Sequence, residues 1–220
     1  MLVIRLAKIA VIAALAAFTL IVAYNNVFDY NSNYQFVRHV LSMDTIFPDS
    51  GLRWRAIDSE TMWHAAYALI IATEASTGLL LALGTVVLLG RLRATAKIFN
   101  HTKLWAVAGL TLGFCLWFFG FVVIGGEYFA MWQSKTWNGQ EGAFRIATTM
   151  LAAMVFVSLP DAELARRLWP NARRSPIFLI RIVRTGFPAA PDEQPVSGFQ
   201  ATTRTSVLAE RSDRHRQSRA

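Results

Sequence analysis

The sequence predicts an all-α protein, a four-helix transmembrane bundle, and three observations carry this prediction. Of the 220 residues 54% are hydrophobic and only 16% charged, whereas about a quarter of an ordinary soluble domain is charged. The apolar residues are gathered in four long runs, and the basic residues are concentrated between and after particular runs. This composition excludes a disordered chain, and the single cysteine, Cys115, excludes a disulfide scaffold.

The four runs predict helices at about residues 6–24, 63–90, 104–126 and 143–159. About 20 mostly apolar residues are needed to cross the hydrocarbon core, so the second and third runs suffice alone and the others need flanking residues. The first run resembles a signal peptide, because Arg5 and Lys8 precede a short apolar stretch. Residues 21–23 fit a cleavage site poorly because Ile21 is large, so we expect a retained helix in which Lys8 snorkels.

Basic residues near the helix ends predict the orientation, since cytoplasmic loops carry an excess of them. The link at residues 91–103 has four basic residues and no acid, whereas residues 25–62 have three arginines against five acids. We therefore expect both termini to be cytoplasmic, with residues 25–62 and about 127–142 outside.

The same placement accounts for the net charge of +8 and the pI of about 10.2. Residues 160–220 contain eleven arginines and six acids, which favours contact with anionic lipid at the cytoplasmic face rather than with nucleic acid. We expect a membrane domain at 1–165 and a basic tail at 166–220. The tail is expected to be partly interfacial and, from Pro188 onward, disordered.

Glu74 is the most informative single residue in the apolar runs. A carboxyl group inside the bilayer is energetically costly, so we expect it to face the bundle interior. At 100° per residue, Tyr67 and Thr77 fall on its helix face. No basic residue lies at matching depth, so we expect a protonated or hydrogen-bonded Glu74. The candidate hydrogen-bond partners are Thr19, Thr111, Thr148 and Thr149. A proton or cation relay and a neutral hydrogen-bonding role both stay open.

The first outer loop is rich in aromatic and amide side chains, and Phe36, Val37, Val40 and Leu41 have the spacing of a short interfacial helix. His39, Asp44 and His64 lack the paired spacing of a zinc motif. We therefore expect no metal and no other cofactor, although a haem between His64 and His39, or a quinone at a site that the sequence does not locate, stays an alternative. No nucleotide loop, catalytic triad or carboxylate pair is present, so no catalytic residue is assigned.

Three stretches carry a family resemblance: FDYNSNYQFVRHVLSMDT at 28–45, WHAAY at 63–67, and GEYFAMWQS at 126–134 continued by WNGQ at 137–140. Together they resemble the bacterial family of predicted small integral membrane proteins, over about residues 5–165. The resemblance implies a multi-pass protein of the bacterial inner membrane with four spans, and it implies no activity.

The matching motifs cluster in the first and third loops and at the start of the second helix, which predicts an ordered extracytoplasmic cap. In this cap we expect a buried network of Arg38, Asp44, Glu127 and Arg145. We expect Tyr34, Trp132 and Trp137 to form an aromatic lid over this network. His39 and His64 are expected in the same cap.

The leading functional hypothesis is a non-enzymatic accessory or scaffold module that recognises a partner protein, or a second copy, through this cap. The alternatives are a small transporter or channel subunit that uses Glu74, and a redox anchor that holds quinone or haem.

Overall fold

The computed structural model describes residues 2–163, and every regular element in this range is helical. The basic tail expected at 166–220 lies outside the described residues. The elements follow in the order α1 Leu2–Phe28, α2 Tyr30–Ser42, η1 Arg53–Arg55, α3 Glu60–Gly90, α4 Ala96–His101, α5 Leu104–Phe114, η2 Cys115–Tyr128, η3 Met131–Gln133 and α6 Gln140–Ser158.

Four helical stretches are long and apolar enough to cross a membrane, as the sequence predicts. They are Leu2–Phe28, Glu60–Gly90, Ala96–Tyr128 and Gln140–Ser158. The first two reach further than expected because polar residues at their ends, such as Asn26 and Glu60, continue the helix.

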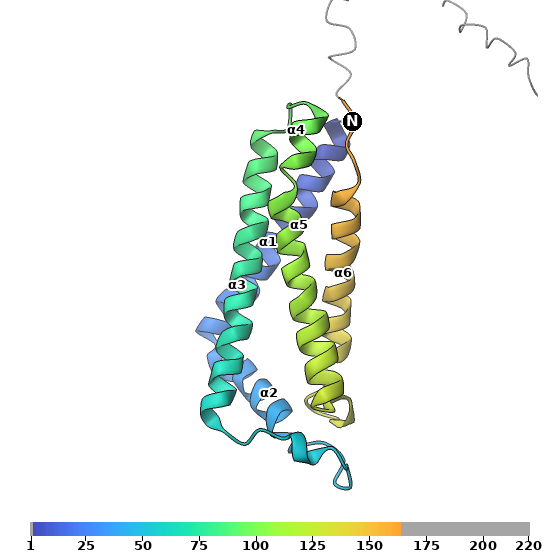
Figure 1. Ribbon diagram of the computed structural model, residues 1–220. Coiled ribbons are helices and arrows are strands. Elements are labelled where there is room, and N and C mark those ends of the chain that lie inside the picture. The colour runs from blue at the N-terminus through green and yellow to red at the C-terminus, as the bar shows by residue number, and fades with distance from the viewer. Residues whose placement is uncertain (1, 164–220) are drawn as a thin grey trace, which may run out of the picture. The chain divides into compact units, whose positions relative to one another are not determined.

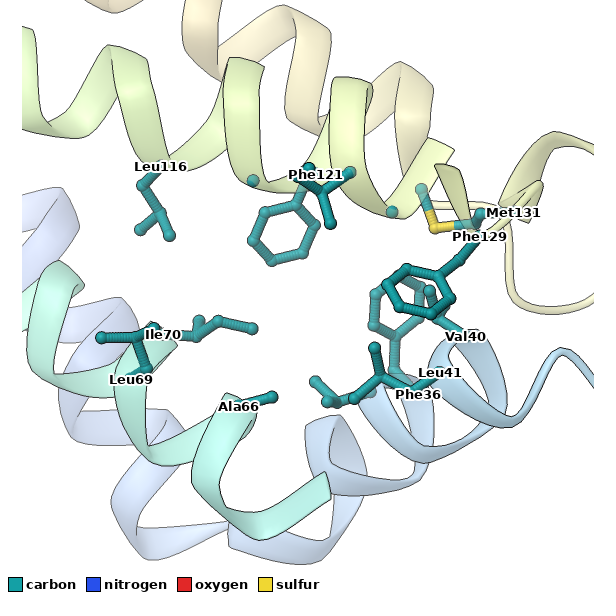
Figure 2. A pocket seen from close by; sticks show the side chains of 14 residues that line it. Phe36, Val40, Leu41, Ala66, Leu69, Ile70, Leu116, Phe121, Phe129 and Met131 are labelled. Carbon is teal, nitrogen blue, oxygen red and sulfur yellow. The ribbon is translucent and has the colours of Figure 1, made fainter. Parts of the chain in front are cut away.

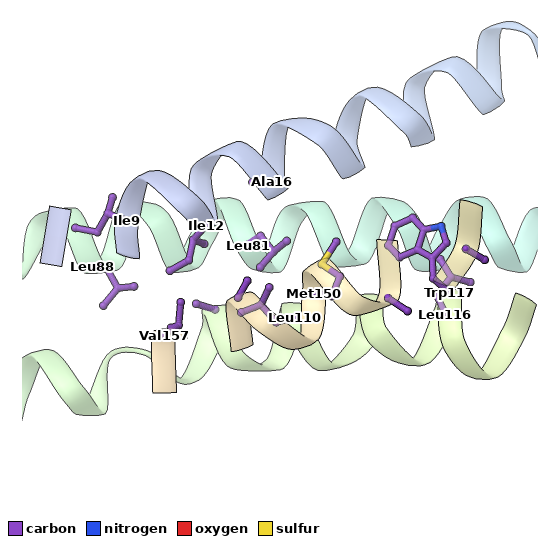
Figure 3. Close-up of a cluster of buried hydrophobic side chains, with 14 of the residues drawn as sticks. Ile9, Ile12, Ala16, Leu81, Leu88, Leu110, Leu116, Trp117, Met150 and Val157 are labelled. Carbon is purple, nitrogen blue, oxygen red and sulfur yellow. The ribbon is translucent and has the colours of Figure 1, made fainter. Parts of the chain in front are cut away.

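The long helices pack in chain order, α1 on α3, α3 on α5 and α5 on α6 (Figure 1). The short helix α4 lies at one end, hereafter the α4 end, and α2 lies at the other, the α2 end. The helix α1 is inclined to the other three (Figure 3). As a result its C-terminal part meets α3 well inside that helix rather than at its start.

The third span changes its hydrogen-bonding pattern at Cys115, where α5 passes into the π-helix η2. A π-helix is wider than an α-helix and usually occurs only as a single turn, often at a functional site. Here it continues for 14 residues to Tyr128. The α2 half of this span is therefore wider than the α4 half.

The core runs through the middle of the bundle (Figure 3) and includes the fully buried side chains of Ile12, Leu81, Leu110 and Met150. In lipid, helices associate mainly through close van der Waals contact, which small residues permit. At Gly84, α3 comes so close to α5 that an added Cβ would lie 2.8 Å from the backbone nitrogen of Ala106.

Gly84→Ala should therefore lower the free energy of unfolding by about 1–3 kcal/mol, because backbone atoms cannot move aside as a flexible side chain can. Gly90→Ala is the matched control, since nothing lies within 4 Å of a Cβ there. The unfolding midpoint of each purified variant measures the effect. Equal midpoints for the two variants would contradict the close crossing.

Candidate functional site

Glu74 lies fourteen residues into α3 and is 2% exposed. Its Oε2 accepts a hydrogen bond of 2.7 Å from Nδ2 of Asn26, near the end of α1. Asn33 donates to Oδ1 of Asn26 at 2.5 Å, and the Tyr67 hydroxyl donates to the Asn26 backbone oxygen at 3.2 Å. Glu74, Asn26, Asn33 and Tyr67 form what we call the Glu74 network.

The expected threonine partners of Glu74 were wrong. The hydroxyls of Thr19, Thr111 and Thr149 donate to backbone oxygens of their own helices, and none of the four threonines bonds to Glu74 within residues 2–163. The physical reason is the inclination of α1, which brings its asparagine-containing end to the depth of Glu74. The adjacent Asn25 and Asn26 at the end of an apolar run were the available signal.

Glu74, Tyr67 and Thr77 do share the buried face of α3, as the helical spacing predicts. The Thr77 hydroxyl is buried and has no hydrogen-bond partner in the described part of the chain.

At the α2 end, the first and third loops contact each other through uncharged side chains. The Thr45 and Ser134 hydroxyls are 2.8 Å apart, and Oε1 of Gln133 accepts from the backbone nitrogen of Phe47 at 3.2 Å. The His39 ring stacks on Trp137 with centroids 4.7 Å apart, and its Nδ1 is 2.7 Å from Oδ2 of Asp44.

A second aromatic group surrounds His64 at the start of α3. The Tyr34 ring stacks on the imidazole at 4.3 Å between centroids, and the Tyr30 hydroxyl is 2.8 Å from Nδ1. His64 thus already has a hydrogen-bond partner and a stacking partner. Within residues 2–163, no three His, Cys, Asp or Glu side chains gather as metal ligands would.

The buried charge network expected in the cap is wrong. Arg38, Asp44, Glu127 and Arg145 are all exposed and form no ion pair with one another in the described range. Each lies on an outer face of its helix or loop, where water solvates the charge and pairing gains little. Trp132 is exposed as well, whereas Tyr34 is buried.

The strongest polar site was missed by the sequence reasoning and lies at the α4 end. Lys8 and Lys103 both donate to Oδ2 of Asp161, at 2.8 and 2.5 Å, and both also donate to the backbone oxygen of Leu159. Asn100 bonds the backbone oxygen and nitrogen of Asp161. The side chains of Lys8, Lys103 and Asp161 are at most 6% exposed.

Arg5 completes this group, which we call the charged cluster: Arg5, Lys8, Lys103 and Asp161. Its guanidinium is fully buried and donates to the backbone oxygens of Leu92, Ala94 and Ala162. The expectation that Lys8 snorkels toward water was wrong, because its ammonium group is buried and binds Asp161 and the Leu159 oxygen.

The charged cluster holds three cations and one carboxylate, and backbone oxygens accept the remaining hydrogen bonds of the cations. Leu92 follows α3 and Leu159 follows α6, so Arg5 and the two lysines bind where the helix dipoles are negative. Burial by itself would raise the pKa of the Asp161 carboxyl. The hydrogen bonds and charges of Lys103 and Lys8 more than offset this and hold that pKa below its ordinary value of 3.8.

A cavity of about 180 Å³ lies between α2, α3 and η2 (Figure 2). All 14 lining residues are apolar, and Glu74 is not among them. From α2 they are Phe36, Val37, Val40 and Leu41, from α3 Ala66, Leu69 and Ile70, from η2 Leu116, Gly120, Phe121, Ile124 and Gly125, and after η2 Phe129 and Met131, the first residue of η3. The sequence predicts a short helix at residues 36–41 and apolar runs for the other two walls, but it gives no signal that these three elements enclose a cavity.

Comparison with known proteins supports the membrane assignment. The family model described as predicted small integral membrane protein (DUF2165) matches residues 4–160. No curated protein and no solved structure matches the chain. The match covers well over half of the sequence and all four long helices, so the chain belongs to the DUF2165 family of predicted small integral membrane proteins.

Proposed function

We propose that this protein is a non-enzymatic accessory or scaffold module of the bacterial inner membrane. In this proposal both termini are cytoplasmic, and the α2 end forms an extracytoplasmic cap that recognises a membrane-protein partner.

The observation that carries the proposal is a set of exposed aromatic side chains on the loops of the α2 end. Trp54 is 75% and Trp132 48% exposed. The ring of Phe47 meets that of Trp132 edge-on at 5.9 Å, and Arg55 lies over the rings of Trp54 and Tyr128. Exposed Trp, Tyr and Arg are the residue types that contribute most at protein interfaces.

The distribution of free charge supports the orientation. Arg5, Lys8 and Lys103 are occupied in the charged cluster, but Arg91, Arg93 and Lys97 remain exposed at the α4 end. An excess of solvated basic residues at that end is typical of the cytoplasmic side.

The proposal is tested by purifying the tagged full-length chain from its native membrane in mild detergent. We expect a stoichiometric partner protein whose yield falls at least about tenfold, the effect of about 1.4 kcal/mol, in a Trp54→Ser, Trp132→Ser double variant. Trp105→Ser is the matched control, because Trp105 is also exposed but lies near the α4 end. A partner retained by the double variant, or no stoichiometric partner at all, would overturn the proposal.

The transport alternative needs a water-accessible route to Glu74, and it receives less support. The described cavity has no polar lining residue and does not include Glu74. Proton- or cation-linked flux into vesicles that is abolished by Glu74→Gln would favour transport over the accessory role. A Soret band or bound quinone in the purified protein would favour the redox alternative over the accessory role.

A further inference from the structure

The apolar cavity at the α2 end has the properties of a binding site for a segment of one hydrocarbon chain. Large side chains close part of the cavity, including Phe36 of α2 and Phe121 of η2 (Figure 2), whereas Gly120 and Gly125 leave gaps between the side chains of the η2 wall. A Cβ added at Gly120 would meet only Leu116, at 3.8 Å. The glycines of the π-helix therefore leave space that ordinary side chains would fill.

The cavity borders the surface that faces the bilayer. Among its lining residues, Leu69 is highly exposed and Ile124 is partly exposed, and both belong to stretches that are apolar enough to span. A lipid chain can therefore approach the cavity from the bilayer. A ligand with a polar ring, such as a quinone head group or a nucleotide, would lose its hydrogen bonds among these 14 apolar residues.

A cation lies beside the cavity. Arg38 is exposed, and its guanidinium lies 5.4 Å from the ring of Trp63, with only a long hydrogen bond of 3.4 Å to Gln35. Within residues 2–163 it pairs with no carboxylate. Trp63 packs in the same side-chain cluster as Val37 and Ala66, both of which line the cavity.

We infer that this cavity binds a segment of one acyl chain of a glycerophospholipid whose phosphate contacts Arg38. Transfer of the chain from the bilayer gives no hydrophobic gain, so retention depends on close packing in the cavity and on the phosphate contact. The inference is independent of the proposed partner recognition, because it uses none of the exposed tryptophans.

The site can be tested in vesicles of phosphatidylethanolamine and phosphatidylglycerol that contain a trace of phosphatidylglycerol with a diazirine at mid-chain. After irradiation of the full-length protein, peptide mass spectrometry locates the adducts. We expect adducts on Val37, Val40 and Leu116, whose side chains are at most 9% exposed. Lipid that merely surrounds the protein would label exposed residues such as Phe119 instead.

Gly120→Leu fills the cavity and should reduce the adducts on those three residues at least about tenfold, which corresponds to about 1.4 kcal/mol. Gly142→Leu is the control, since nothing lies within 4 Å of a Cβ at that α6 glycine. Adducts absent from the three residues in the wild type, or unchanged in Gly120→Leu, would overturn the inference.

A second measurement does not depend on how Gly120→Leu folds. Native mass spectrometry of the detergent-purified protein should show about one retained phospholipid per chain, fewer in Arg38→Ala, and partial recovery in Arg38→Lys, which restores the positive charge. Retention of a quinone or a free fatty acid instead, or equal phospholipid retention in Arg38→Ala, would contradict the assignment.

Discussion

An Asp161→Asn variant is expected to lose about 3–5 kcal/mol of the free energy of unfolding, because it leaves Lys8 and Lys103 buried together without a counter-ion. Both lysines donate to the same Oδ2 atom, and their side chains are nearly inaccessible to water. The measurement is the unfolding midpoint of the full chain in detergent. Glu163→Gln is the matched control, because Glu163 is exposed and a glutamine can still accept from the backbone nitrogen of Ala96.

Adding Lys103→Met to Asp161→Asn should recover part of the lost stability, since it removes one of the two lysine charges that Asp161 no longer balances.

The pH dependence of stability is a further check on the role of Asp161. Because the pKa of Asp161 is held below 3.8, its contribution is complete above that value and disappears as the pH falls through the lowered pKa. The difference between wild type and Asp161→Asn should therefore narrow below about pH 4. A constant difference, or none at neutral pH, would contradict the role of this carboxylate.

An Asn26→Leu variant is expected to lose about 1–3 kcal/mol, because the Glu74 carboxyl group would remain buried without its donor. Glu74→Gln should cost less, since a glutamine oxygen at this position can still accept from Asn26. The Tyr67 hydroxyl keeps its bond in both variants because it uses the backbone oxygen of residue 26. Unfolding midpoints of the two variants provide the comparison.

The double variant Asn26→Leu, Glu74→Leu is the control for this pair. Replacing both partners of a buried hydrogen bond by apolar groups is often nearly neutral, so its midpoint should exceed that of Asn26→Leu. The opposite ranking, with Glu74→Gln more damaging than Asn26→Leu, would contradict this account and show that the ionisable carboxyl group itself stabilises the fold.

The sequence predicts the four helices well because each needs only a long apolar run, and this signal is local. Helical spacing also predicts the short helix α2, which extends over Tyr30–Ser42. In the same way, spacing within α3 places Tyr67 and Thr77 on the buried face of Glu74.

Partners across the bundle could not be predicted, because they depend on the inclination and length of helices. Arg5 and Lys8 look like ordinary flanking charges, since the positive-inside rule counts basic residues without asking what they bind. Asp161 lies three residues beyond the end of α6 and belongs to no helical pattern. The π-helix gives no clear signal either, although its glycines at 120, 125 and 126 are unusually frequent.

The charged cluster has a consequence for how the protein is made. Synthesis runs from the N-terminus, so α1 enters the membrane carrying Arg5 and Lys8 long before residues 159–163 leave the ribosome. During that interval Lys8 has neither Asp161 nor the Leu159 oxygen to bind. The contacts of the charged cluster to residues 159–162 can form only when the last helix is in place, so the complete cluster exists only in the fully inserted chain. In a chain that stops within α6, Arg5 could still bind the oxygens of Leu92 and Ala94, but Lys8 would lack both of its partners.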